Sequence, residues 1–362
     1  MSEAFKSSEI IYTMTYQKLF KLTRGFLSLE RENKSYRTFL SDLLGGYEEA
    51  VHDLEVDSES LGISFDTLCE QIHRLCLSIL ECIDMYSHAQ VDGSIQLMKD
   101  ILNDESFRIY QVEEGSNWYR SRLVCGKERV YKANQMFHVP FEMVRKIGNA
   151  RYSISGYPCL YLSNTVWGCW EELGEPALED FCTSLLKPKR KIELLDLRLP
   201  SISEKADLAK ILYTLPLVIA CSIEVQYTED PFKPEYVIPQ IVMLALVENP
   251  RFMGCIFTSS KTTPNFEWPD DLLWNIAMPV LFVSDKGLCS KLSIFFEATD
   301  AVNYKYEIIK CNVASNRYSS EKDIDEIYGV PHIGETVYEN YQGSIFGQLE
   351  NVLSSEELKS LN

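Results

Sequence analysis

Polar side chains that could bind a ligand or catalyse a reaction stand inside apolar segments of this chain. Arg120 lies in the alternating segment 118–123, Glu172 follows an aromatic run, and Ser259 ends the apolar segment 255–258. A guanidinium presents a planar fork of donors to a phosphate or a carboxylate. A carboxylate among apolar residues pairs with a cation or accepts a specific hydroxyl hydrogen bond, because an isolated buried charge is unfavourable. This combination predicts a polar pocket with a floor of core residues.

Each of these residues also has an ordinary structural interpretation. Arg120 and Arg151 are compatible with surface or ion-paired arginines, and Glu172 with a glutamate on a helix surface. Tyr161 stands on an apolar segment, which is typical of a core tyrosine with a hydrogen-bonded hydroxyl. Ser259 precedes a polar run and could simply end a strand. The residue types taken singly leave both interpretations open.

The N-terminal third of the chain has the periodicity of helices. Apolar residues recur every three or four positions through 68–83, and Ser64 is a suitable N-cap before them. Residues 1–110 contain no glycine-rich phosphate loop and no serine–histidine grouping. We therefore expect a helical accessory domain over 1–110 that serves packing or partner recognition.

From residue 117 the pattern changes to short apolar runs separated by glycine and proline, which favours strands and loops. The pattern predicts strands over 118–123, 158–163, 192–198 and 255–258, and a helix from 165 that carries Glu172. It also predicts a helix over 207–223 that is interrupted or kinked near Pro216, and a helix from Pro239 to Asn249. The expected fold class is α+β, with a mixed β core flanked by helices. We expect a catalytic domain over 117–315 and a C-terminal extension over 316–362.

Composition restricts the classes of partner. Hydrophobic residues make up 46% of the 362-residue chain and charged residues 24%, as in ordinary globular proteins. The 35 lysines and arginines against 53 aspartates and glutamates give a formal net charge of −18. This charge disfavours direct binding to nucleic acid or to anionic membranes. A local basic patch could still hold a small phosphate ligand.

Cysteine and histidine usage indicates a reduced compartment and no structural metal. The eleven cysteines form no Cys-x-x-Cys pair, and the five histidines show no metal-ligand spacing. The N-terminus lacks the pattern of a secretory signal, and the apolar run 211–223 is shorter than the roughly 20 residues of a membrane-spanning helix. We expect a cytoplasmic protein whose cysteines are thiols.

Two separated motifs give the chain a family resemblance. The block Pro158-Cys-Leu-Tyr-Leu-Ser163, followed by Glu172, and the block Gly254-Cys-Ile-Phe-Thr-Ser259 occur in this order after the strand that carries Arg120. In this order and internal spacing the chain resembles the RES domain family, named for its arginine, glutamate and serine. The resemblance covers residues 117–285, and it departs from the family in the long N-terminal region and in the long segment between the two motifs.

The resemblance implies a fold similar to that of ADP-ribosyltransferases and an activity on NAD+, commonly that of a toxin encoded beside an antitoxin. No metal is implied. The catalytic residues that it implies are Arg120, Glu172 and Ser259, and the NAD+-binding residues that it implies are Tyr119, Arg151 and Tyr161.

The resemblance leaves several functions open. Cleavage of the nicotinamide–ribose bond with water, phosphate or a protein side chain as acceptor gives a glycohydrolase, a phosphorylase or an ADP-ribosyltransferase respectively. A non-catalytic interaction protein, in which the helical domain binds a partner, is a rival from another class. An antitoxin or immunity protein and a second copy of the chain are further partners that the sequence leaves open.

Overall fold

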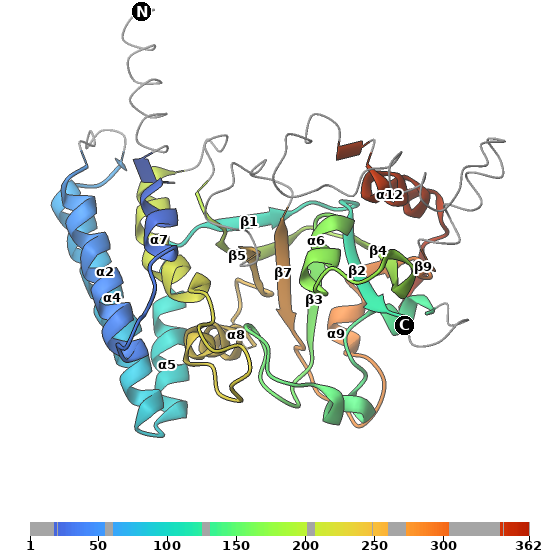
Figure 1. Ribbon diagram of the computed structural model, residues 1–362, viewed down its shortest axis with the longest axis horizontal. Helices are drawn as coiled ribbons and strands as arrows, with labels where there is room; N and C mark the ends of the chain where they lie inside the picture. The colour runs from blue at the N-terminus through green and yellow to red at the C-terminus, as the bar shows by residue number, and fades with distance from the viewer. Residues whose placement is uncertain are drawn as a thin grey trace, which may run out of the picture. The chain divides into compact units, whose positions relative to one another are not determined.

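The computed structural model (Figure 1) describes residues 18–19, 21–54, 61–124, 131–200, 207–247, 249–259, 273–303, 341–342 and 344–361. Helices and a mixed set of strands confirm the expected α+β class. The chain forms two compact units: unit 1 contains Met1–Tyr110, Gly148–Ser155 and Glu193–Asn265, and unit 2 contains Gln111–Ile147, Gly156–Ile192 and Phe266–Asn362. Both units are discontinuous in sequence, and the expected division into domains over 1–110, 117–315 and 316–362 stays a prediction.

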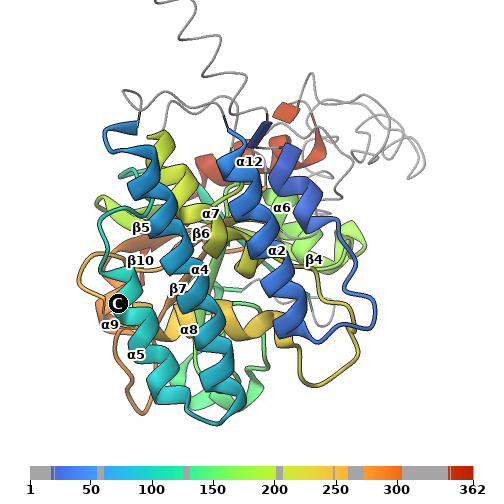
Figure 2. The ribbon, with the colours of Figure 1, turned by 90° about the vertical axis from the view of Figure 1, so that its left-hand side faces the viewer.

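The described helices of unit 1 include α2 (Tyr36–His52), α4 (Phe65–Ser87), α5 (Val91–Leu102), α7 (Leu208–Ser222) and α8 (Val237–Leu246), with a 3₁₀ turn η4 (Pro234–Tyr236) before α8. Helix α4 contacts the four other helices, and Figure 2 shows α2, α4 and α5 side by side. Ser64 caps α4 as expected, because its side chain accepts a hydrogen bond from the backbone N–H of Thr67. The predicted apolar stripe over 68–83 is buried.

Helix α7 is apolar on all sides and belongs to the core of unit 1. It confirms the helix predicted over 207–223 and continues through Pro216. Asp207 caps it by accepting hydrogen bonds from two backbone N–H groups of the first turn. Among the described helices, none combines the length and the apolar character that a bilayer crossing requires.

The strands of unit 1 adjoin this helical core. Strand β5 (Ile192–Leu197) pairs in parallel with β6 (Cys255–Thr258), and both were expected from the sequence. Strand β1 (Ile109–Val112) begins in unit 1 and neighbours β5. The chain between β5 and β6 contains α7 and α8, so these helices form the crossover that a parallel pair requires.

Unit 2 contains an antiparallel sheet in the order β7 (Trp274–Pro279), β3 (Cys159–Ser163), β2 (Trp118–Leu123), β4 (Phe181–Pro188), β8 (Phe296–Ala298) and β10 (Lys359–Ser360), with β9 (Val302–Asn303) also paired to β4. Its short helices are η1 (Ala133–Met136), η2 (Phe141–Lys146), α6 (Val166–Glu172), η3 (Leu178–Asp180) and α9 (Ser290–Ser293), and its longest described helix is α12 (Ile345–Ser355). The predicted strand over 118–123 and the predicted helix that carries Glu172 are confirmed as β2 and α6.

Helix α6 lies tightly against the sheet of unit 2. It contacts β2, β3 and α12, and its buried aromatic residues belong to an apolar cluster that includes Phe346 of α12. Gly168 permits this approach, because a Cβ at this position would collide with Ser163 Oγ and come within 3.2 Å of Thr165 Oγ1. Thr165 is also the N-cap of α6, since its Oγ1 accepts the Gly168 N–H at 2.9 Å. The close packing therefore fixes the helix that carries Glu172.

We expect Gly168→Ala to lower the free energy of unfolding by about 1–3 kcal/mol, the usual range for overpacking. This loss outweighs the gain of about 1 kcal/mol that alanine brings inside a helix. Gly45→Ala is the matched control, because Gly45 lies in α2 and a Cβ added there would meet no atom within 4 Å. Denaturant titration of both variants tests the prediction, and equal stability of the two would contradict it.

Candidate functional site

Arg120 is a buried cation without a carboxylate partner among the residues that the structure describes. It lies on β2 between β3 and β4, and its Nη1 donates a hydrogen bond of 2.8 Å to the backbone carbonyl of Tyr161 on β3. Its Nε is buried and has no acceptor among the described residues. Within the same part of the chain, no aspartate or glutamate forms an ion pair with Arg120. One donor of the guanidinium therefore lacks an acceptor among the described residues.

Burial, together with the neighbouring Arg122 charge, lowers the pKa of Arg120 to about 10. The guanidinium is still a cation at neutral pH. A buried charge without a counter-ion destabilises the protein unless a ligand supplies the opposite charge. This environment favours the binding of an anionic group such as a phosphate at Arg120.

Glu172 ends α6 with an exposed carboxylate. Its Oε1 accepts a hydrogen bond of 2.7 Å from Nδ2 of Asn275, a buried residue of β7. The apolar surroundings expected for Glu172 are found at the preceding residue. Glu171 is 5% exposed and accepts a hydrogen bond of 2.9 Å from Trp167 Nε1. The helix therefore directs one glutamate into the core and leaves the next at the surface.

Asn275 is a site residue that the sequence interpretation missed. Backbone pairing between β3 and β7 places it opposite Ser163, two residues after Tyr161. A side-chain amide donor on a rigid strand fixes the orientation of an otherwise mobile carboxylate. The only sequence signal was its position in an apolar run, where a polar residue requires a partner.

Cys169 places Arg120 and Glu172 in one neighbourhood. Burial raises the pKa of the Cys169 thiol to about 12; the Arg120 charge acts against this rise and the Glu172 charge adds to it. The thiol contacts the Tyr119 carbonyl oxygen at 3.3 Å. The Cys169 thiol therefore lies within the electrostatic influence of both side chains, and the convergence of Arg120 and Glu172 in one site stays a prediction.

The two predicted tyrosines have different environments. Tyr161 is partly buried on β3, and its backbone carbonyl holds the Arg120 guanidinium. Tyr119 is 2% exposed and belongs to the apolar cluster under α6. Alternation along β2 explains the difference between Tyr119 and Arg120, because neighbouring residues point to opposite faces of the sheet. The burial of Tyr119 favours a packing role over the predicted contact with NAD+.

The remaining two predicted residues belong to unit 1. Arg151 donates from Nη1 to the backbone carbonyls of Cys221 and Ile223, at 3.0 and 2.9 Å, and so binds the C-terminal end of α7. Ser259 follows β6 and is 2% exposed. Their convergence with Arg120 and Glu172 in one cleft stays a prediction.

A buried glutamate from the C-terminal segment anchors α6. Glu350 of α12 is 9% exposed, and its Oε1 accepts hydrogen bonds from the Val166 N–H at 2.9 Å and from the Tyr341 hydroxyl at 2.6 Å. Val166 is the first residue of α6, where backbone N–H groups have no partner within the helix. Burial raises the pKa of Glu350. No local sequence signal pointed to this contact, because 184 positions separate its two residues.

A buried histidine stands in the electrostatic field of Arg120. The His138 Nδ1 donates to its neighbour's carbonyl, while Nε2 accepts the Cys289 N–H at 2.8 Å. Burial lowers the pKa of His138 to about 4, and the Arg120 charge contributes to this shift. The imidazole is therefore neutral at pH 7, and Arg120 and Arg122 are cations of this neighbourhood.

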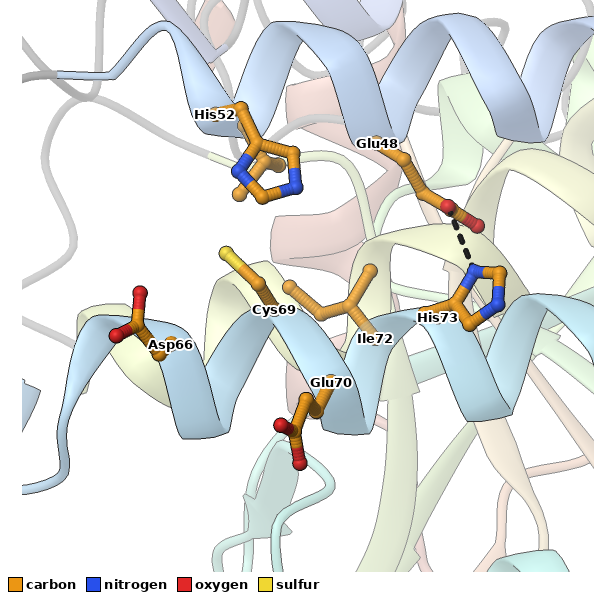
Figure 3. A pocket seen from close by; sticks show the side chains of 8 residues that line it. Glu48, His52, Asp66, Cys69, Glu70, Ile72 and His73 are labelled. Atoms are coloured by element: carbon orange, nitrogen blue, oxygen red, sulfur yellow. Dashed lines mark hydrogen bonds and ion pairs between the residues drawn. The ribbon is translucent and has the colours of Figure 1, made fainter.

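Unit 1 contains a cavity of about 350 Å³ that is lined by carboxylates, in contrast to the cationic surroundings of Arg120 (Figure 3). It lies between α2 and α4, and its polar lining residues are Glu48, His52, Asp66, Cys69, Glu70 and His73. Glu48 and His73 form an ion pair of 2.9 Å across it. No group of three metal-ligating side chains that could hold an ion occurs in the described part of the chain. The carboxylates disfavour a phosphate here, so this cavity is not a candidate for the dinucleotide.

Comparison with known proteins points to a toxin-like relative. The chain is 28% identical over 349 residues to "Putative toxin YopC" from Bacillus subtilis (strain 168), and the alignment covers 87% of this chain and 75% of that protein. No protein-family model matches the chain, so the RES-like motifs stand as a resemblance. No solved structure matches it significantly either.

The His138 environment predicts a pH dependence of stability. Its pKa of about 4 lies below the reference value of 6.5, so the unfolded chain binds more protons between these two values. We expect the free energy of unfolding to fall as pH drops from 6.5 to 4, by about 3 kcal/mol from this group. His138→Gln keeps an acceptor for the Cys289 N–H but cannot titrate, and it should flatten this part of the profile. Identical profiles for the two proteins, measured by denaturant titration, would contradict the assignment.

The Glu350 contact predicts a graded series of variants. Glu350→Gln keeps an oxygen that accepts both hydrogen bonds, and we expect nearly unchanged stability at pH 7. Tyr341→Phe removes one bond and should cost about 1 kcal/mol, whereas Glu350→Ala leaves a buried N–H without a partner and should cost about 1–3 kcal/mol. A double-mutant cycle between Glu350→Ala and Tyr341→Phe measures the coupling. Additive effects would show that the two residues do not act together.

Proposed function

We propose that this chain is a toxin that degrades NAD+ by cleaving the bond between nicotinamide and ribose. The relative that carries a toxin name and the RES-like motifs support the class of protein. The observation that carries the chemistry is the partly buried Arg120 cation, which has no carboxylate partner among the described residues and whose buried Nε has no acceptor there. It stands in the same neighbourhood as a fixed, accessible carboxylate, Glu172.

Arg120 binds the pyrophosphate of NAD+ in this proposal. The pyrophosphate supplies the negative charge that the buried guanidinium lacks, and charge-assisted hydrogen bonds to a phosphate are short and strong. Tyr161 holds the guanidinium through its carbonyl and orients the ribose next to the nicotinamide. The family resemblance also implies Arg151 and Ser259 as site residues, with the serine fixing either the arginine or the nicotinamide amide.

Glu172 stabilises the charge that develops during bond cleavage. The nicotinamide of NAD+ is a good leaving group because its ring carries a positive charge, and departure leaves an oxocarbenium-like ribose, as in glycoside cleavage. The bond from Asn275 orients the carboxylate, which accepts from a ribose hydroxyl in this proposal. A carboxylate held in place before the reaction stabilises the cation without reorganisation.

Water, phosphate or a protein side chain can accept the ribosyl group in this scheme. The corresponding products are ADP-ribose, a phosphorylated ADP-ribose and an ADP-ribosylated protein. A toxin of this kind acts on the cytoplasmic NAD+ pool and requires a neutralising partner in its own host. The antitoxin or immunity protein that the resemblance implies has this role in the proposal.

We expect Glu172→Gln to lower NAD+ cleavage by at least about a hundredfold while the fold is kept, because one preorganised charge typically contributes this much. Glu193→Gln is the matched control, since Glu193 is an exposed glutamate on β5 of unit 1. Asn275→Ala should lower kcat less than Glu172→Gln and should have no further effect in the Glu172→Gln background, as expected of a positioning residue. The measurement is NAD+ consumption by the purified chain, followed by mass spectrometry.

Parallel incubations with and without inorganic phosphate identify the acceptor from the mass of the product. Expression in a bacterial host provides a second readout, because an NAD+-consuming enzyme lowers the cellular NAD+ pool and arrests growth. A non-catalytic interaction protein would do neither. Unchanged turnover or unchanged growth arrest in the Glu172→Gln variant would refute the proposed site.

A further inference from the structure

Unit 1 contains a second cavity, of about 330 Å³, whose chemistry differs from that of the acidic cavity in Figure 3. Its lining comes from the end of α4, from the segment 148–155, and from the segment 231–240 that includes η4 and the start of α8. The residues that matter for the argument are Tyr86, Asn149, Phe232, Lys233, Tyr236 and Gln240. The volume is at the lower end of the range for small-molecule sites.

A cationic side chain, Lys233, lines this cavity although the chain carries a net charge of −18. The Lys233 ammonium lies 5.8 Å from the centroid of the Tyr236 ring, and the Arg151 guanidinium carbon lies 5.3 Å from the same centroid. In the described part of the chain, neither cation forms an ion pair with a carboxylate. Glu235, which follows Lys233 by two positions, is buried and paired with Arg31 at 3.2 Å. An anionic group in the cavity would meet the Lys233 ammonium, which lines it and has no carboxylate partner in the described part of the chain.

Aromatic rings line the same cavity. Phe232 is 58% exposed, and its ring is nearly parallel to that of Tyr86, with an angle of 7° and a centroid distance of 6.4 Å. An exposed phenylalanine at the wall of a cavity offers a flat apolar face for a planar ring of a ligand. The combination of cation and aromatic face favours a ligand with an anionic group and a planar ring.

Two side-chain amides restrict the ligand further. Gln240 donates from Nε2 to the carbonyls of Ala150 and Ser153, at 3.0 and 3.3 Å, so its Oε1 remains as an acceptor. Asn149 accepts from the Ser155 backbone N–H and hydroxyl, at 3.0 and 3.1 Å, so its Nδ2 remains as a donor. These bonds fix which end of each amide is the oxygen. The cavity thus presents one oriented acceptor and one oriented donor, as the edge of a heterocyclic base requires.

We propose that this cavity is a binding site for a nucleoside monophosphate. The phosphate lies at Lys233, the base stacks on Phe232, and the base edge bonds to Gln240 and Asn149. The proposal uses residues of unit 1 alone, and it does not depend on the NAD+-cleaving activity proposed for Arg120 and Glu172 of unit 2. It assigns unit 1 a ligand of its own in place of the accessory role expected from the sequence.

Calorimetric titration of the full chain with AMP, GMP, CMP and UMP tests the site, with the matching nucleosides and inorganic phosphate as separate probes. We expect saturable binding of at least one monophosphate, weaker binding of its nucleoside, and still weaker binding of phosphate. Lys233→Gln should weaken the monophosphate about tenfold and leave the nucleoside unchanged, because one charge-assisted bond is lost. Phe232→Ala should weaken both, because both carry the base.

The controls separate this site from the proposed dinucleotide site. Lys146→Gln, which removes an exposed lysine of unit 2, should leave binding unchanged. Arg120→Lys and Glu172→Gln should also leave it unchanged, whereas they impair NAD+ cleavage. Absence of saturable binding by all four monophosphates overturns the proposal. The proposal is also overturned if Lys233→Gln leaves monophosphate binding unchanged, as the control Lys146→Gln should. Loss of binding in the Arg120→Lys variant would overturn it as well.

Discussion

The cation on β2 is the constraint around which unit 2 is organised. Arg120 stands on a strand with neighbours on both sides, and its guanidinium is held by a backbone carbonyl instead of a carboxylate. A charge that is buried without a counter-ion is less stable than the same charge in water. The rigid sheet nevertheless holds the Arg120 guanidinium in this position. Replacement by a neutral residue would remove this unfavourable contribution, and the proposed role of the charge is to bind an anionic ligand.

Helix α6 carries Glu172, the carboxylate of the proposed site. Gly168 lets the helix approach β3, Glu350 binds its first N–H group, and Asn275 holds the carboxylate at its last residue. These three contacts come from three separate parts of unit 2, and each acts on a different point of a helix of seven residues. A helix this short is unstable alone, so tertiary contacts determine its position. The orientation of Glu172 therefore depends on the whole unit.

The two cavities of unit 1 differ in the sign of their charge. Carboxylates line the cavity between α2 and α4, whereas lysine, aromatic rings and oriented amides line the other. A strongly acidic chain repels phosphates on average, yet the local arrangement of side chains gives the two cavities different charges. Glu235 illustrates the mechanism, because its burial beside Arg31 removes the acidic residue that would otherwise pair with Lys233. Net charge therefore describes the surface average and not the site.

The sequence by itself determined the class of fold, the strands that carry Arg120 and Tyr161, and the helix that ends at Glu172, because hydrophobic periodicity and capping are local properties. The sequence also identified Arg120 and Glu172 as candidate site residues. Only the tertiary structure decided that Glu171, and not Glu172, is the buried glutamate, and that Tyr119 packs in the core. The partners Asn275 and Glu350 and both cavities likewise came from contacts between distant segments. Such contacts leave no periodic trace in the chain, since packing between elements and not spacing along the sequence selects them.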